Sequence, residues 1–477
     1  MFRNLVQVCS LAGALLVASF AHAADRPPNV VLLLIDDLGW TDLGCQGSKF
    51  YETPHIDRLA AGGMRLTRGY SACTVCSPTR AAVMTGKYPA RLHITDWIAG
   101  HQRPHARLKV PDWTKHLPHD EPTIAEAFRA GGYATAHIGK WHLGDELYWP
   151  KTHGFDQNIG GNHKGQPPSY FFPYDGKGVT LPGLSTGEEG EYLTDRLTDE
   201  AVKFVTANQH RPFFLYLPHY TVHTPLEAKP DLVAKYRAKA QPEEPQNNAV
   251  YAAMIESLDD GIGKLLAALD ALQLRDETIV VFTSDNGGLM SSTSNAPLRV
   301  GKGSAYEGGV RVPLIVSYPP AIPAGSTSDV PAMSIDLFPT LAELCGLPVG
   351  GKQAGWDGVS LAAALKQSGR PARDALYWHY PHYHPGGATP YGAVVAGDYR
   401  LVEFYEDGQV ELYNLRSDIG ESNDLAASLP SKRDELLAML QTWRKQVGAQ
   451  MPTPNPDYDA QQDQARPAGK GKGKKKK

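Results

Sequence analysis

The stretch Asn29-Val-Val-Leu-Leu-Leu-Ile35-Asp36-Asp37 decides the fold class of this 477-residue chain. Its apolar residues do not alternate with polar ones, which is typical of a strand buried on both faces of a parallel sheet. Further runs of this kind are Ala134–Ile138, Phe213–Leu217, Thr278–Phe282 and Pro313–Ser317. Helical patterns lie between the runs, at Thr123–Ala130, Thr194–Asn208 and Asn248–Leu272. The alternation predicts an α/β fold, with a large, mostly parallel sheet sandwiched by helices.

The sequence changes in character from about Gly369, where aromatic and turn residues become frequent. Short strands are predicted at Val394–Val395, Tyr399–Phe404 and Val410–Tyr413, followed by a helix at Lys432–Val447. This order predicts a smaller antiparallel α+β domain. The predicted division is a large α/β domain at 24–368, the small domain at 369–450, and a disordered Lys-rich tail at 451–477.

The N-terminus has the pattern of a secretory signal peptide. Met1-Phe-Arg-Asn4 supplies a basic start, Leu5–Phe20 an apolar core, and Ala21-His22-Ala23 a cleavage site. We therefore expect residues 1–23 to be removed and the protein to be exported to the periplasm or beyond. After cleavage no membrane span is expected. The alternative is an uncleaved N-terminal anchor. The chain has no Asn-x-Ser/Thr sequon, which favours a bacterial source. Its net charge of −4 gives no overall attraction to nucleic acid.

A small-residue loop, Ser71-Ala-Cys-Thr-Val-Cys76-Ser-Pro78, delivers Cys76 to the start of a predicted helix that ends at Gly86. Pro78 suits the first helical position. A side chain at Cys76 would face unpaired backbone N–H groups, which attract anions and lower the pKa of a thiol. The alternatives are a structural cysteine or a redox pair with Cys73.

Acidic pairs follow two of the predicted strands. Asp36-Asp37 come directly after the first run, and Asp285-Asn286 follow Thr278–Phe282. Ligands of open α/β sheets bind at the carboxyl ends of strands, so these residues are expected to converge. Three carboxylates and an amide oxygen suit Ca²⁺, and less well Mg²⁺, rather than zinc. Helix capping is the alternative for either pair alone.

Cations and histidines follow the other runs. Lys140 and His142 come after Ala134–Ile138, and His219 and His223 come after Phe213–Leu217. Lys302 precedes the last run. Each could be structural, but together they would surround a tetrahedral oxyanion with positive charge.

These motifs resemble those of a known family. Cys76-Ser-Pro78-Thr-Arg80 resembles the C-x-P-x-R hallmark of type I sulfatases, and Gly139-Lys-Trp-His-Leu-Gly144 resembles their second hallmark. Matching blocks also include Gly301-Lys302-Gly303 and Glu307-Gly-Gly-Val-Arg-Val-Pro313. The resemblance spans roughly Asn29 to Leu361. It implies the alkaline-phosphatase superfamily fold, a large α/β domain followed by a small antiparallel-sheet domain.

The resemblance also implies the composition of the site. Cys76 would be converted to formylglycine by a formylglycine-generating enzyme, so that the thiol is not the working nucleophile. Arg80 would hold the modified residue. The implied ligands of Ca²⁺ are residue 76, Asp36, Asp37, Asp285 and Asn286. The implied sulfate contacts are Lys140, His142 and Lys302, with His223 matching the family pattern better than His219.

The implied activity is sulfuric ester hydrolysis through a formylglycine gem-diol at position 76. One hydroxyl, deprotonated with help from a carboxylate such as Asp285, would attack sulfur. His223 or Lys302 would protonate the leaving alcohol, and His142 would deprotonate the second hydroxyl to expel sulfate. A serine at position 76 should therefore accept sulfate but fail to turn over.

The expected substrate is a sulfated carbohydrate, as in polysaccharide degradation, with aryl sulfates as surrogates. Two segments rich in rings, 93–113 and 377–384, can stack on sugars or pack between domains. A phosphonate or phosphate ester hydrolase of the same superfamily is the first alternative. A non-catalytic binder of sulfated glycans is the second, and a secreted thiol oxidoreductase is the third.

Overall fold

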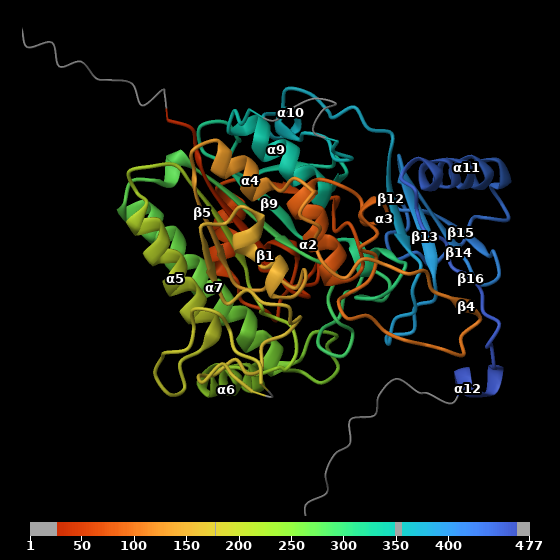
Figure 1. Cartoon of the computed structure of the whole chain (residues 1–477), viewed down its shortest axis with the longest axis horizontal. Helices are drawn as coiled ribbons and strands as arrows, with labels where there is room; N and C mark the ends of the chain where they lie inside the picture. Colours follow the sequence, from red (N-terminus) through yellow and green to blue (C-terminus); the bar gives the residue numbers. More distant parts are fainter. Residues whose placement is uncertain (1–25, 177, 349–354, 465–477) are drawn as a thin grey trace, which may run out of the picture.

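The computed structural model describes residues 26–176, 178–348 and 355–464. Its largest element is an eight-stranded mixed sheet (Figure 1). The strands, in spatial order, are β10 (Ser326–Ser328), β2 (Met64–Leu66), β9 (Leu314–Ser317), β8 (Thr278–Ser284), β1 (Asn29–Ile35), β7 (Phe213–Pro218), β5 (Ala134–Ile138) and β6 (Gln157–Ile159). β1 pairs in parallel with both β7 and β8, whereas β9 is antiparallel to β8 and β2. The predicted α/β class and the five predicted strands are confirmed.

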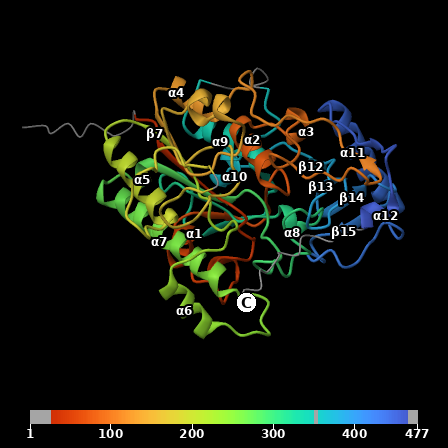
Figure 2. The same ribbon diagram turned by 60° about the horizontal axis from the view of Figure 1, so that its bottom comes forward.

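Helices cover both faces of this sheet, and β1 contributes to both cores. Val31 and Leu33 pack in a cluster with α5 and α7, whereas Val30 and Leu32 pack in a second cluster with α2, α4 and α9. This arrangement explains why the run shows no polar alternation. Figures 1 and 2 show α5 and α7 on one side of the sheet and α4 and α9 on the other. The helix bounds are α1 Pro54–Ala61, α2 Cys76–Thr85, α3 Pro89–Leu92, α4 Ile124–Ala130, α5 Leu193–Ala207, α6 Pro230–Lys239, α7 Ala249–Ala271, α9 Leu337–Leu344 and α10 Ala362–Leu365.

A four-stranded antiparallel sheet forms the C-terminal part, drawn in blue beside the main body in Figure 1. Its strands are β12 (Ala375–Tyr380), β13 (Tyr391–Ala396), β14 (Tyr399–Phe404) and β15 (Val410–Asn414), and α11 (Pro430–Gln446) packs on it. β12 falls in a segment read from sequence as a ring-rich loop. Five of its six residues are buried, because Trp378 packs on Tyr70 while Tyr377, on the other face, stacks on Trp443 of α11. Period-two alternation is therefore absent. The predicted domain boundary at Gly369 remains a prediction.

The sequence predicts disorder from Met451 onward, but the structure has a strand and a helix between Met451 and Gln464. β16 (Thr453–Pro454) pairs with β4 (Leu108–Lys109), and α12 (Ala460–Gln464) follows. The partner strand is more than 300 residues away in the sequence, so local composition could not predict the pairing. The remaining Lys-rich residues and the predicted signal peptide lie outside the described residues. Among the helices that the structure describes, none is long and apolar enough to span a membrane.

A buried ion network joins the C-terminal sheet to the main body. Arg400 of β14 lies 3.0 Å from Glu307 at the start of α8 (Glu307–Val310) and 3.2 Å from Glu421. All three side chains are fully buried. The backbone N–H of Glu307 donates to Glu421 at 2.7 Å. Burial raises the pKa of Glu421 to about 8, although the nearby Arg400 opposes this rise.

Arg400→Met should lower the free energy of unfolding by about 3–5 kcal/mol, because it leaves two carboxylates buried without their cation. Urea unfolding measures this loss. Arg416→Ala is the matched control, since Arg416 forms an exposed ion pair with Asp398 and should cost no more than about 1 kcal/mol. Equal, small losses in both variants would show that the network does not stabilise the interface.

Candidate active site

The two acidic pairs meet at the carboxyl ends of β1 and β8. Ile35 is in register with Ser284, so the residues that follow each strand lie side by side. The backbone N–H of Asp37 donates to Asp285 Oδ1 at 3.2 Å. Asn286 Nδ2 donates to Asp37 Oδ1 at 2.8 Å. The parallel pairing therefore brings together the four residues expected to bind a metal.

Three buried oxygens in this cluster have no hydrogen-bond partner, namely Asp36 Oδ1, Asp37 Oδ2 and Asn286 Oδ1. Buried polar atoms are normally paired, so three oxygens without a donor in one place are suited to a cation. Burial also raises the pKa of Asp36 to about 8. Carboxylate and amide oxygens are the donors that Ca²⁺ prefers. The residues present therefore fit a hard divalent cation.

Three cations compensate the carboxylates. Arg80 donates to Asp285 Oδ2 from Nη2 at 2.7 Å and from Nε at 3.0 Å. Lys140 Nζ lies 2.6 Å from Asp36 Oδ2, and Lys302 Nζ lies 2.6 Å from Asp37 Oδ1. Arg80 also lies 3.6 Å from Asp36 Oδ1, so every carboxylate is paired with at least one cation. Lys140 and Lys302 were expected to contact sulfate, and in this structure they contact the carboxylates of Asp36 and Asp37. Arg80 was expected to hold residue 76, and in this structure it orients Asp285.

Cys76 is the first residue of α2, and Val75 precedes it as the cap. Pro78 therefore occupies the third helical position instead of the first, where its missing N–H is equally harmless because the first turn has no intrahelical acceptors. The expectation of a lowered thiol pKa is wrong. Burial raises the pKa of Cys76, since desolvation outweighs the attraction of Lys140 and Lys302.

His142 is the nearest base to Cys76, with Nδ1 at 3.3 Å from Sγ. Its Nε2 hydrogen-bonds the carbonyl of Ile98. Ser77 Oγ donates to the His142 carbonyl at 2.9 Å and accepts from the Ile98 N–H at 3.1 Å. Burial lowers the pKa of His142 well below its usual range, which keeps the ring neutral. The helix start, His142 and Ile98 are thus fixed to one another.

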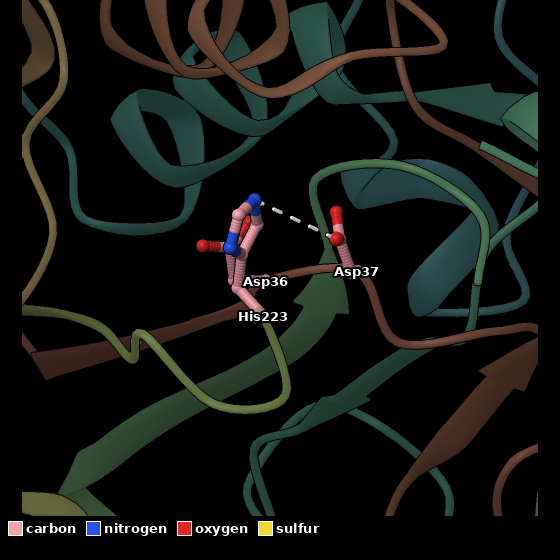
Figure 3. Close-up of side chains that lie close together, drawn as sticks. All are labelled: Asp36, Asp37 and His223. Atoms are coloured by element: carbon pink, nitrogen blue, oxygen red, sulfur yellow. Dashed lines mark ion pairs between the residues drawn. The ribbon is translucent and has the colours of Figure 1, made fainter. Parts of the chain in front are cut away.

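His223 is the histidine that reaches the acidic cluster. Its Nε2 lies 3.8 Å from Asp37 Oδ2, and Figure 3 shows its ring turned toward Asp36 and Asp37. His219 is buried and does not line the cavity described below. Burial lowers the pKa of His223 to about 3, with a further contribution from Lys302. Of the two histidines that the sequence left open, His223 is thus the one beside the acidic cluster, and its catalytic role stays a prediction.

An active-site cavity of about 630 Å³ opens above these groups. Its floor includes Cys76, His142, His223 and Lys302. Its wall comes from segments 97–99, 164–168 and 384–385. Segment 164–168 was not singled out in the sequence, because its Gly and Pro residues resemble an ordinary loop.

The two ring-rich segments contribute both to the cavity wall and to packing within the protein. Trp97 and His384 line the active-site cavity. Trp378 instead packs between the two sheets, edge to face with Tyr70 at 5.4 Å. Cys73, the proposed redox partner, is buried, and none of the described cysteines forms a disulfide.

Comparisons with known proteins agree with this geometry. The family model described as "Sulfatase" matches residues 28–347, and that described as "N-sulphoglucosamine sulphohydrolase, C-terminal" matches residues 300–447. A sulfatase of Formosa agariphila is 33% identical over 92% of each chain. Human arylsulfatase A is 32% identical over 90% of this chain and 89% of its own.

A solved structure, Ps i-CgsB in complex with k-i-k-neocarrahexaose, is 31% identical. It covers 91% of this chain and 95% of its own, with a TM-score of 0.76. The family model, the relatives and the architecture agree. The chain belongs to the sulfatase family and is a type I sulfatase of the alkaline-phosphatase superfamily.

Proposed function

We propose that this protein removes sulfate from a sulfated carbohydrate, using a formylglycine formed from Cys76 and a Ca²⁺ ion. The observation that carries the proposal is the set of three unpartnered oxygens at the strand ends, with Cys76 on the floor of the adjoining cavity. Asp36, Asp37, Asp285 and Asn286 would hold the ion, together with residue 76. Formylglycine supplies a carbonyl whose hydrate is a nucleophile, and Ca²⁺ supplies positive charge against the anionic ester.

Charge balance explains why such a site would attract a sulfate ester. With Asp36 ionised beside a bound metal, three carboxylates would face three side-chain cations, and these formal charges would cancel. A divalent cation among the carboxylates would leave the site with a net positive charge. Because the side chains are buried, this charge is weakly screened and acts strongly on an anion in the cavity. Anion binding is thus coupled to metal binding.

Proton transfers fall to groups already in place. His142 Nδ1, 3.3 Å from the side chain of residue 76 and kept neutral by burial, can accept a proton from that residue. Lys302 lies on the cavity floor. Burial lowers the pKa of Lys302, but the Asp37 carboxylate outweighs this effect and raises it. The lysine is therefore protonated and is our candidate proton donor to the leaving oxygen. His223 is the second candidate donor. Because its lowered pKa keeps the ring neutral, Lys302 is the better candidate for this role.

The choice of a carbohydrate rests on the cavity wall and on the relatives. Trp97 and His384 present ring faces or edges to the cavity, as sugar-binding sites do. The similar i-CgsB structure holds a neocarrahexaose. The N-terminal pattern supports export to the periplasm or beyond, where such polymers are met.

Protein produced with a formylglycine-generating enzyme should yield a Cys76 peptide in which one oxygen replaces one sulfur and two hydrogens. Cys76→Ala should lower aryl sulfate turnover by at least about 10³-fold. Cys45→Ala is the control, since Cys45 is half-buried and lies outside the active-site cavity. Turnover by protein whose Cys76 is intact would refute the modification. Faster cleavage of the matched aryl phosphate would favour the phosphate ester alternative.

Addition of Ca²⁺ to chelator-treated protein should raise the midpoint of thermal unfolding, by the equivalent of about 2.7 kcal/mol at a hundredfold excess over Kd. Asn286→Ala removes one unpartnered oxygen without changing the charge and should weaken Ca²⁺ binding by at least about tenfold. Asp329→Ala, at an exposed surface carboxylate, should leave binding unchanged. An unfolding midpoint that does not respond to Ca²⁺ would contradict the proposed metal site.

A further inference from the structure

A second cavity adjoins the active-site cavity. This outer cavity has a volume of about 840 Å³ and is lined by segments 99–104 and 108–116, with His382 and segment 455–457. Ala99 lines both cavities, so they meet along one edge. Each cavity alone lies within the roughly 300–1,000 Å³ range of small-ligand sites. Together they offer more room than the single sulfated group at Cys76 requires.

The boundary between the cavities is a fixed turn at residues 96–101, here called the lip. Asp96, nearly fully buried, accepts hydrogen bonds from Tyr380 Oη at 2.8 Å and from the Trp97 N–H at 2.9 Å. On the other side, Ile98 donates to Ser77 Oγ at 3.1 Å. The lip is therefore held by both β12 and α2. These hydrogen bonds fix its position relative to α2, which carries Cys76.

The outer cavity carries the mixed set of groups that sugars bind. Trp113 is half-buried, its ring edge-on to His382 at 5.6 Å. Lys115 Nζ lies 5.5 Å from the centre of the Trp113 ring. Lys115 and Lys109 are exposed, and within the described residues neither forms an ion pair with a carboxylate. Indole faces stack on sugar rings, and ammonium groups bind sulfates.

Two carboxylates also line the outer cavity, Asp112 and Asp457. They offset the charge of the two lysines, so the cavity is not a uniformly basic surface. Carboxylates accept hydrogen bonds from hydroxyl groups. Such a combination suits a hydroxylated ring with a sulfate better than it suits an inorganic anion.

The far wall is built by the segment after Met451. Asn455 Nδ2 donates to the carbonyls of Pro104 and Ala106 at 2.8 and 2.7 Å. Arg103 forms an ion pair with Asp463 at 2.5 Å. Figure 1 shows β4 and β16 side by side, near α12. The C-terminal segment thus holds the 103–109 part of the wall in place.

Resting on the proposed function, we propose that the outer cavity is a second sugar subsite. It binds the neighbouring residue of a sulfated oligosaccharide whose reacting ester lies in the active-site cavity. Trp113 provides the stacking surface, and Lys109 and Lys115 bind a sulfate on that neighbouring ring. The protein would therefore prefer oligosaccharides over monosaccharides.

The test compares Trp113→Ala and the Lys109→Ala/Lys115→Ala double variant with wild-type protein. Substrates are 4-nitrophenyl sulfate and the disaccharides and hexasaccharides of carrageenan, chondroitin sulfate and heparan sulfate. Both variants should lower kcat/KM for the preferred hexasaccharide by about tenfold, as expected for the loss of one aromatic or ionic contact. Turnover of 4-nitrophenyl sulfate should change less than twofold. Lys366→Ala, at an exposed lysine outside both cavities, is the control and should change neither.

Equal losses on aryl sulfate and hexasaccharide, no loss on either, or turnover of aryl sulfate alone would each overturn the subsite. Calorimetric binding of the hexasaccharides to Cys76→Ala protein separates this inference from the proposed function. If wild-type protein cleaves no sulfate ester but Trp113→Ala weakens hexasaccharide binding, the proposed function fails and the subsite stands. If esters are cleaved and binding does not respond to Trp113→Ala, only the subsite fails. Absence of any binding or turnover overturns both.

Discussion

Parallel pairing of β1 with β8 is the constraint on which the site depends. It places two acidic pairs at one sheet edge, where three buried carboxylates would repel one another if uncompensated. Arg80, Lys140 and Lys302 come from three other parts of the chain to neutralise them. Each of these cations also fixes its own segment: helix α2, the turn after β5, and the loop before α8. The ion pairs with the carboxylates thus fix these three segments around the site.

The nucleophile loop is held from two sides by packing. Ala81, Val83 and Met84 of α2 lie in the core beneath the large sheet, whereas Val75 and Ala82 pack against the C-terminal sheet. Residue 76 therefore sits where the two sheets meet. Its burial raises the pKa of the thiol, so an unmodified cysteine is a poor nucleophile here. Burial also weakens the screening of charges. The positive charges of the site would therefore act more strongly on a substrate anion.

Much of the fold could be predicted because its strands are fully buried. The bounds of β1 and β5 agree with the sequence to the residue, since long apolar runs between turn residues leave little choice. The start of α2 was less predictable, because Cys76 and Ser77 are weak helix formers and their helical state depends on tertiary contacts. β12 was missed because nearly all of its residues are buried and so show no period-two alternation. The 451–464 segment was missed because its partner strand β4 lies more than 300 residues away in the sequence. The site residues were recognisable because each directly follows a strand or forms part of a hallmark motif. By contrast, segment 164–168 of the cavity wall was not, since its Gly and Pro residues carry no periodic pattern.

The central claim is that the strand-end oxygens form a Ca²⁺ site that includes a modified residue 76. Anomalous X-ray diffraction from crystals of the mature protein grown with Ca²⁺ tests it most directly. The account predicts one calcium peak among Asp36, Asp37, Asp285 and Asn286, with oxygen in place of sulfur at residue 76. A map with no such peak, an intact thiol, and Lys140 and Lys302 still paired with Asp36 and Asp37 would contradict it.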